Sequence, residues 1–256
     1  MSTTSLLSHA AAALGPPPPI DSRRVALFAD LDGTLAPIEA RPADVGPDPR
    51  RARLLDRLSA VLGGRLAVIS GRGLGDLDRV LGGRIPALAA VHGLVRRTAA
   101  GAVVGRPPLR LPAGARQALK AFAGQDEKLA LEDKGAALAL HYRAHPAMGG
   151  PCRDLARKLA EDFDLKVQEG NMVVELRAPG PTKADAVAAF MAEAPFAGAL
   201  PVFIGDDLTD EDGFAAAARL GGYGVIVGAR RPTGALYALD GVDAALAWLA
   251  GAGAGR

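Results

Sequence analysis

The chain has 256 residues, which is enough for one large folded domain or for a domain with a smaller unit attached. Its 49% of hydrophobic and 23% of charged residues fit an ordinary folded protein and exclude a wholly disordered, collagen-like or coiled-coil chain. A net charge of +2 and only 4% of aromatic residues argue against binding of nucleic acid or of an anionic membrane surface.

The first 22 residues are expected to form a disordered tail. Their short apolar stretch has no basic residues before it, unlike a signal peptide, and the prolines at 16–19 cannot join the interior of a helix or sheet. No stretch approaches the roughly 18 consecutive apolar residues of a membrane-spanning helix. The single cysteine, Cys152, cannot form an internal disulfide, so a reducing cytoplasm is the expected location.

Short apolar runs predict the strands of a parallel sheet, because runs that are apolar on both faces suit strands covered by helices. The runs lie at residues 25–30, 66–71, 85–93, 201–207 and 223–228. Apolar residues at helical spacing predict helices over 49–62, 183–194, 212–220 and 242–249. This alternation is typical of a doubly wound α/β core.

The middle of the chain has a different pattern. Residues 127–143 alternate around a Lys-Gly pair and residues 164–177 around Glu-Gly-Asn, which predicts two antiparallel hairpins. Helical stretches at 113–122 and 153–163 precede them. We therefore expect a small αββαββ cap over 108–178, inserted between core segments 23–107 and 179–250, with linkers near Pro107 and Pro179.

Two acidic segments follow predicted core strands. Asp30 and Asp32 can point the same way because side chains alternate along a strand, although a capped turn also fits this pair alone. Asp206, Asp207 and Asp210 follow the run at 201–207, and part of this acidity also suits a helix start. Because like charges at one sheet edge repel unless a cation neutralises them, the sequence predicts an oxygen-ligated Mg²⁺ site.

A hydroxyl and a lysine complete the pattern. Ser70, Gly71 and Arg72 close the second run, where a hydroxyl and an exposed N–H can hold a phosphate oxygen. Lys183 begins a predicted helix, where its ammonium group and the helix N-terminus can face an anion; alone, it equally fits a solvated surface lysine. Together with the carboxylates, these residues predict a phosphoryl-transfer site.

These motifs, in this order, resemble the haloacid-dehalogenase-like phosphohydrolase superfamily, of which DLDGT at 30–34 is the most specific marker. The segments LEDKG at 131–135, HYR at 141–143, VVELR at 173–177 and residues 193–214 resemble the trehalose-6-phosphate phosphatase family, over about residues 23–250. The cap segments carry this distinction, because phosphatases with other substrates share the core motifs.

The resemblance implies a role for each candidate residue. Asp30 would attack phosphorus to form an aspartyl-phosphate, and Asp32 would protonate the leaving sugar oxygen and later activate water. Mg²⁺ would be held by Asp30, the main-chain carbonyl of Asp32 and Asp206, with Asp207 and Asp210 supporting it indirectly. Lys183 and the 70–72 loop would hold the phosphoryl group, and the sugar hydroxyls would be bound by Glu132, Lys134, Arg143 and Glu175.

The function expected from this resemblance is Mg²⁺-dependent hydrolysis of trehalose 6-phosphate by a monomer that binds a small sugar phosphate and no nucleic acid or membrane. A phosphatase for another sugar phosphate is the first alternative, and a sugar phosphomutase of the same fold is a second. A non-catalytic binding module is disfavoured because every expected catalytic carboxylate is present.

Overall fold

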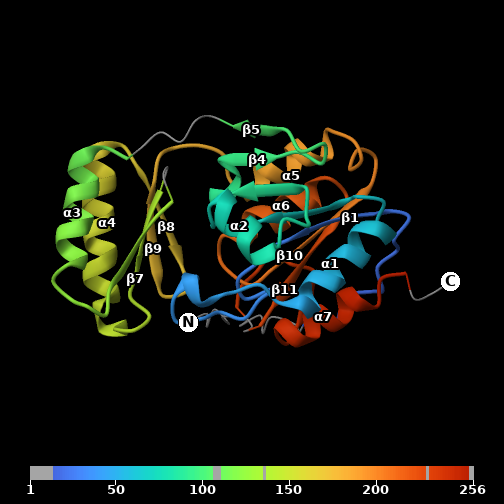
Figure 1. Cartoon of the computed structure of the whole chain (residues 1–256), viewed down its shortest axis with the longest axis horizontal. Coiled ribbons are helices and arrows are strands. Elements are labelled where there is room, and N and C mark those ends of the chain that lie inside the picture. Colours follow the sequence, from blue (N-terminus) through green and yellow to red (C-terminus); the bar gives the residue numbers. More distant parts are fainter. Residues whose placement is uncertain (1–13, 106–110, 135–136, 229–230, 254–256) are drawn as a thin grey trace, which may run out of the picture.

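The computed structural model describes residues 14–105, 111–134, 137–228 and 231–253, which form two sheets flanked by helices (Figure 1). The larger sheet has the strand order β12-β11-β10-β1-β2-β3-β4-β5. Strands β12 to β3 run parallel, and β4 and β5 add an antiparallel edge. Its strands are β1 (Val25–Ala29), β2 (Leu66–Ile69), β3 (Ala87–Ala90), β4 (Val95–Arg97), β5 (Val103–Gly105), β10 (Leu200–Gly205), β11 (Tyr223–Val227) and β12 (Tyr237–Leu239).

Helices cover both faces of this sheet. The helices α1 (Pro49–Val61), α2 (Leu74–Leu81) and α7 (Val242–Ala250) share one apolar cluster with Leu27, whereas α5 (Lys183–Met191) and α6 (Asp210–Arg219) share the other with Phe28. Since successive side chains of a strand point to opposite faces, the adjacent residues Leu27 and Phe28 serve the two layers. The predicted doubly wound α/β fold is confirmed; its antiparallel edge, formed by short and partly exposed strands, was not predicted.

The order of the strands brings distant acidic residues together. From β1 the chain moves to β2 and β3 on one side, and it later returns to β10 and β11 on the other. Ala29 is paired with Ile204, and the Asp30 N–H donates to the Ile204 carbonyl at 2.9 Å. The loops that follow β1 and β10 therefore meet at a topological switch point, where open α/β sheets bind ligands.

The smaller sheet has the order β6-β7-β9-β8, and α3 and α4 cover its outer face at one end of the molecule (Figure 1). Leu138, Leu140, Val174 and Leu176 pack on these helices, so alternate residues of β7 and β9 face the larger sheet. The elements are α3 (Ala113–Ala123), β6 (Ala130–Asp133), β7 (Ala137–His141), α4 (Gly149–Phe163), β8 (Lys166–Gly170) and β9 (Val173–Arg177). This is the predicted αββαββ order, although residues 135–136 of the first turn lie outside the described part of the chain, as do residues 106–110 of the first linker. The cap boundaries themselves stay a prediction.

Residues 14–22 differ from the expected disordered tail. Ile20 is buried, Trp248 of α7 donates to the Pro18 carbonyl at 2.9 Å, and the Ala238 N–H of β12 donates to the Gly15 carbonyl at 2.9 Å. A proline has no N–H to donate, but its carbonyl group can still accept a hydrogen bond. This segment is therefore held against α7 and β12 without forming a strand. Residues 1–13 lie outside the described part. Among the residues described, no helix combines the length and the apolar character needed to cross a membrane.

Candidate active site

A cavity lies where the carboxyl ends of β1, β2 and β10 face the inner side of the smaller sheet. It contains all but one of the site residues predicted from the sequence; Asp210 lies completely buried beneath it. The predicted residues that line the cavity are Asp30, Asp32, Ser70, Gly71, Arg72, Glu132, Lys134, Arg143, Glu175, Lys183, Asp206 and Asp207.

The acidic residues gather at the floor of this cavity. Carboxylate oxygens of Asp30, Asp206 and Asp210 all lie within 4.8 Å of one another. Burial raises the pKa of the Asp30 and Asp206 carboxyls, and the neighbouring carboxylates raise it further. A Cβ atom on Gly33 would lie 2.1 Å from an oxygen of Asp206, so only glycine permits this approach. Hard oxygen ligands that repel one another fit a divalent cation such as Mg²⁺.

Lys183 supplies the positive charge that the chain itself brings to this cluster. Its Nζ atom lies 2.6 Å from Asp210 Oδ1 and 3.2 Å from Asp30 Oδ1. Burial alone would lower the pKa of Lys183, but Asp210 and Asp30 raise it above its usual range, so the side chain stays charged. The second oxygen of Asp210 accepts the Asp207 N–H at 2.9 Å. Both carboxylate oxygens of Asp210 therefore already accept a hydrogen bond, one from Lys183 and one from the main chain. This suits an indirect role for Asp210 beside the proposed metal site.

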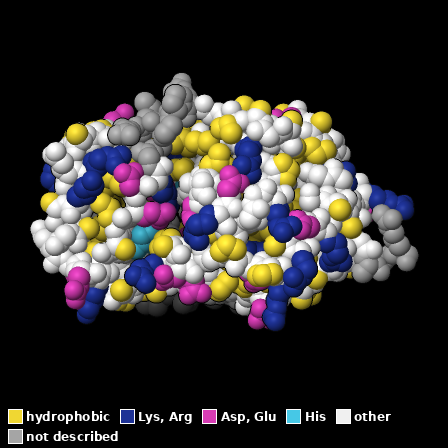
Figure 2. Space-filling view, in the orientation of Figure 1, with side chains coloured by type: hydrophobic (Ala, Val, Ile, Leu, Met, Phe, Trp, Pro, Cys, Tyr) yellow, Lys and Arg dark blue, Asp and Glu magenta, His cyan; other side chains and the backbone are white. Residues whose placement is uncertain are grey.

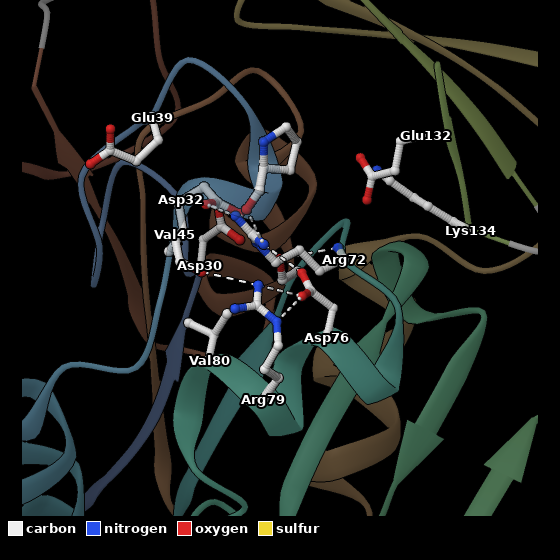
Figure 3. A network of polar contacts seen from close by, with 12 residues as sticks. Asp30, Asp32, Glu39, Val45, Arg72, Asp76, Arg79, Val80, Glu132 and Lys134 are labelled. Atoms are coloured by element: carbon white, nitrogen blue, oxygen red, sulfur yellow. Dashed lines mark hydrogen bonds and ion pairs between the residues drawn. The ribbon is translucent and has the colours of Figure 1, made fainter. Parts of the chain in front are cut away.

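Asp32 and the loop after β2 form the next wall. Ser70 is buried at the end of β2, and its hydroxyl accepts the Arg72 N–H at 3.3 Å. Arg72 is enclosed and makes a two-point ion pair with Asp32, as Figure 3 shows. The Arg72 side chain therefore contacts protein carboxylates, whereas Asp32 remains partly open to the cavity.

Polar residues of the smaller sheet form the opposite wall, where Figure 3 shows Glu132 and Lys134 across the cavity from Asp32. Lys134 Nζ lies 2.5 Å from Glu175 Oε2. Burial alone would raise the pKa of the Glu175 carboxyl, but Lys134 and His92 lower this pKa below its usual range. The carboxyl therefore stays ionised. Its other oxygen, Oε1, is buried and has no hydrogen-bond partner among the described residues. His92 Nε2 lies 3.6 Å from that oxygen, which is too far for a hydrogen bond, so a ligand hydroxyl could supply the missing one.

The cavity is also lined by residues that the sequence did not indicate as site residues, and three of their side chains lie beside Glu132 and Glu175. The strand register puts Gln168 opposite Glu175 in the same cross-strand row as Ala139 and Glu132, so the alternation in β8 could have indicated it. The two others are histidines. His141 Nε2 lies 3.0 Å from Glu132 Oε2. His92 lies 3.6 Å from Glu175 Oε1, and its positive φ of 57° is set by the turn after β3.

The smaller sheet also touches the loops of the larger one. Arg143 donates to the carbonyl groups of Glu39 and of Asn171, the latter at 3.0 Å. A Cβ atom on Gly170, at the end of β8, would lie 2.9 Å from Asp207 Oδ2, so this end of the smaller sheet comes close to Asp207, beside the acidic cluster. Arg143 and Asp207 thus lie where the two sheets meet.

Comparisons with known proteins agree with this geometry. A family model described as trehalose-phosphatase matches residues 28–243. The chain is 40% identical over 230 residues to the trehalose-6-phosphate phosphatase of Escherichia coli (strain K12), covering 89% of this chain and 86% of that protein. It is 38% identical over 268 residues to a probable trehalose-phosphate phosphatase of Sinorhizobium fredii, covering 96% and 98% of the two chains.

Solved structures give the same answer for the fold. The C-terminal domain of Candida albicans trehalose-6-phosphate phosphatase matches with a TM-score of 0.77 and 25% identity over 89% of this chain and 91% of that one. A haloalkanoate-superfamily phosphatase from Bacteroides thetaiotaomicron, at 14% identity and a TM-score of 0.59 over 91% of this chain and 96% of that one, shares the fold alone. Because the family model spans most of the sequence and the bacterial relatives are matched over nearly their whole length, this chain belongs to the trehalose-phosphatase family of phosphoric monoester hydrolases.

Proposed function

We propose that this protein hydrolyses trehalose 6-phosphate to trehalose and phosphate in a Mg²⁺-dependent reaction. The observation that carries the proposal is the pairing, in one cavity, of a carboxylate cluster with a row of polar side chains on the smaller sheet. The first suits a phosphoryl group and the second suits a neutral sugar with many hydroxyl groups. The names of the bacterial relatives support trehalose as that sugar.

In the proposed reaction, a carboxylate oxygen of Asp30 attacks phosphorus while the bond from phosphorus to the sugar oxygen breaks. Asp32 enters this step in its protonated form and gives that proton to the leaving oxygen, so the products of this step are the free sugar, an aspartyl-phosphate and the Asp32 carboxylate. Asp32 then takes a proton from water as the water oxygen attacks phosphorus, which releases phosphate and restores Asp30. The enzyme ends each cycle with its original protons.

The remaining groups would hold the phosphoryl oxygens. Lys183, fixed by Asp210, would compensate their charge, and the Ser70 hydroxyl would donate a hydrogen bond. Asp30, the main-chain carbonyl of Asp32 and Asp206 would hold Mg²⁺. When bound, the ion would neutralise negative charge on the carboxylates and on the phosphoryl group.

Phosphate release from a panel of sugar phosphates tests the substrate. We expect kcat/KM for trehalose 6-phosphate to exceed that for glucose 6-phosphate and sucrose 6-phosphate by at least about 100-fold, because a site built for hydroxyl groups is left with unpaired polar groups by a poorer fit. Equal values for all three would contradict the proposed substrate. A bisphosphate seen by ³¹P NMR without free phosphate would instead indicate a phosphomutase.

Glu175→Gln is expected to weaken sugar binding. The change keeps the volume but removes the charge that accepts hydroxyl hydrogen bonds, each worth about 1.5–3 kcal/mol at a charged group. We therefore expect KM to rise by roughly 10- to 100-fold with a smaller change in kcat. Glu169→Gln is the matched control, since Glu169 lies on the neighbouring β8, pairs with Arg157 and does not line the cavity. Unchanged KM in Glu175→Gln would remove this residue from the sugar site.

A further inference from the structure

The guanidinium group of Arg72 lies between two carboxylates just beyond the carboxyl end of β2 (Figure 3). Its Nε and Nη2 atoms donate to the two oxygens of Asp32, each at 2.7 Å, the two-point geometry of strong arginine–carboxylate pairs. Its Nη1 atom donates to the Pro42 carbonyl at 2.9 Å and to Asp76 at 2.5 Å. Every guanidinium nitrogen of Arg72 is thus engaged by a protein oxygen.

Asp76 links the Arg72 side chain to helix α2, which packs on the larger sheet. It lies in the first turn of α2 and also accepts from Nε and Nη2 of Arg79 at 2.9 and 2.7 Å. Burial would raise the pKa of Asp76, but the hydrogen bonds from Arg72 and Arg79 lower it, so this side chain stays a carboxylate. Arg79 donates in turn to the Val45 carbonyl at 3.0 Å. The result is a row of alternating charges that ends at Asp32 in the cavity.

The two members of the Arg72–Asp32 pair differ in exposure. The Arg72 side chain is 4% exposed and that of Asp32 is 34% exposed. An arginine so enclosed has little surface for a phosphate or a sugar hydroxyl, whereas the carboxylate of Asp32 is open to both. Arg72 therefore contacts the group that would transfer the proton and not the substrate itself.

We propose that Arg72 is a positioning residue that holds the Asp32 carboxylate in one orientation toward the oxygen of the leaving sugar. This inference rests on the function proposed above and replaces the expectation that Arg72 binds substrate. A free aspartate side chain has several rotamers, and misplacement of a reacting group by about 1 Å can cost about 100-fold in rate. Two parallel hydrogen bonds remove that freedom, which a lysine, as a point charge, cannot do. Arg72 keeps its own protons throughout the reaction.

Kinetics of Arg72→Ala and Arg72→Lys test this role. We expect kcat of Arg72→Ala to fall by about 100-fold, with KM for the sugar phosphate changed less than about threefold. Added guanidinium ion should restore at least about a tenth of the lost rate, because it can re-form both hydrogen bonds to Asp32. Arg72→Lys should recover little. A KM that rises while kcat holds would make Arg72 a substrate ligand, and an unchanged kcat would exclude the positioning role.

Arg97→Ala is the matched control for loss of a two-point ion pair. Arg97 donates to both oxygens of Asp78, at 2.9 and 2.8 Å, and to the carbonyl groups of Pro86 and Ile85, away from the cavity. We expect Arg97→Ala to lower the melting temperature and to change kcat by no more than about twofold. The reason is that an ion pair far from the reacting groups does not contribute to binding of the transition state. An equal loss of kcat in both variants would show that the Arg72 effect is one of stability.

Two further measurements keep the test decisive. Should Arg72→Ala fail to fold, Asp76→Asn loosens the anchor while leaving the Arg72–Asp32 pair in place; we expect a loss in kcat of about tenfold without a change in KM, and no loss would overturn the inference. The wild-type protein is assayed first on the sugar-phosphate panel. If it hydrolyses a different sugar phosphate, the proposed substrate fails, and the same kcat and KM comparison is made with the substrate that it does hydrolyse.

Discussion

Asp30→Asn is expected to reduce the rate of phosphate release by at least about 10³-fold, the scale of losing a nucleophile that acts in concert with other groups. The amide keeps the size of the side chain but offers phosphorus no anionic oxygen. Burial raises the pKa of the Asp30 carboxyl, so its charge is costly in the metal-free fold, and we expect the variant to melt no lower than the wild type. Steady-state kinetics and thermal melting measure the two effects.

Covalent labelling separates this mechanism from direct attack by water. Rapid acid quenching with ³²P-labelled substrate should trap a phosphoryl-enzyme in the wild type and none in Asp30→Asn. Asp162→Asn serves as the control, because Asp162 lies on α4 and pairs with Lys158 on the same helix, away from the cavity. Full turnover in Asp30→Asn, or an equal label in both proteins, would exclude Asp30 as the nucleophile.

Removal of divalent cations is expected to lower turnover by at least about 100-fold and to be reversed by Mg²⁺, given that a metal ion contributes several kcal/mol of charge stabilisation. Binding should also stabilise the fold, by about 2.7 kcal/mol at a concentration 100 times the dissociation constant. The rise in melting temperature on adding Mg²⁺ measures this without any activity. The close carboxylates of Asp30, Asp206 and Asp210 are the physical reason for both effects.

Variants locate this metal response. Asp206→Asn should abolish the Mg²⁺-dependent rise in melting temperature, because it removes one of the proposed ligands. Asp212→Asn should retain the rise, since Asp212 is exposed on α6 and does not line the cavity. If EDTA leaves turnover unchanged, Lys183 is a sufficient positive charge for the phosphoryl group and the proposed metal requirement fails.

One face of the molecule carries charged side chains of both signs. Basic and acidic side chains alternate over the face shown in Figure 2, without a broad field of either sign. The composition, with 30 basic and 28 acidic residues, likewise gives no bulk excess of basic charge. The polar groups that the proposal uses lie in the cavity between the two sheets.

Several distant features of the site were predictable from local sequence. Alternating strands and helices put the ends of β1 and β10 at one edge of a parallel sheet, so the sequence predicts that Asp30 and Asp206 meet. In β9, Glu175 lies between Val174 and Leu176, which pack on the helices of the smaller sheet, so the alternation of side chains turns Glu175 away from those helices. These inferences hold because side-chain period and strand direction are local properties of the chain.

Other features depend on contacts that no local pattern carries. The pairing of Arg72 with Asp32 depends on how the loop after β2 approaches the loop after β1, and Gln168 reaches the cavity because of the register between β8 and β9. Residues 14–22 are held in place because the carbonyl groups of Pro18 and Gly15 accept hydrogen bonds from α7 and β12. The sequence alone thus determined the fold class, the family and the sheet edge at which the carboxylates meet, through periodicity and motif order. Only the tertiary structure decided which charges pair, because pairing depends on distances between segments that are far apart along the chain.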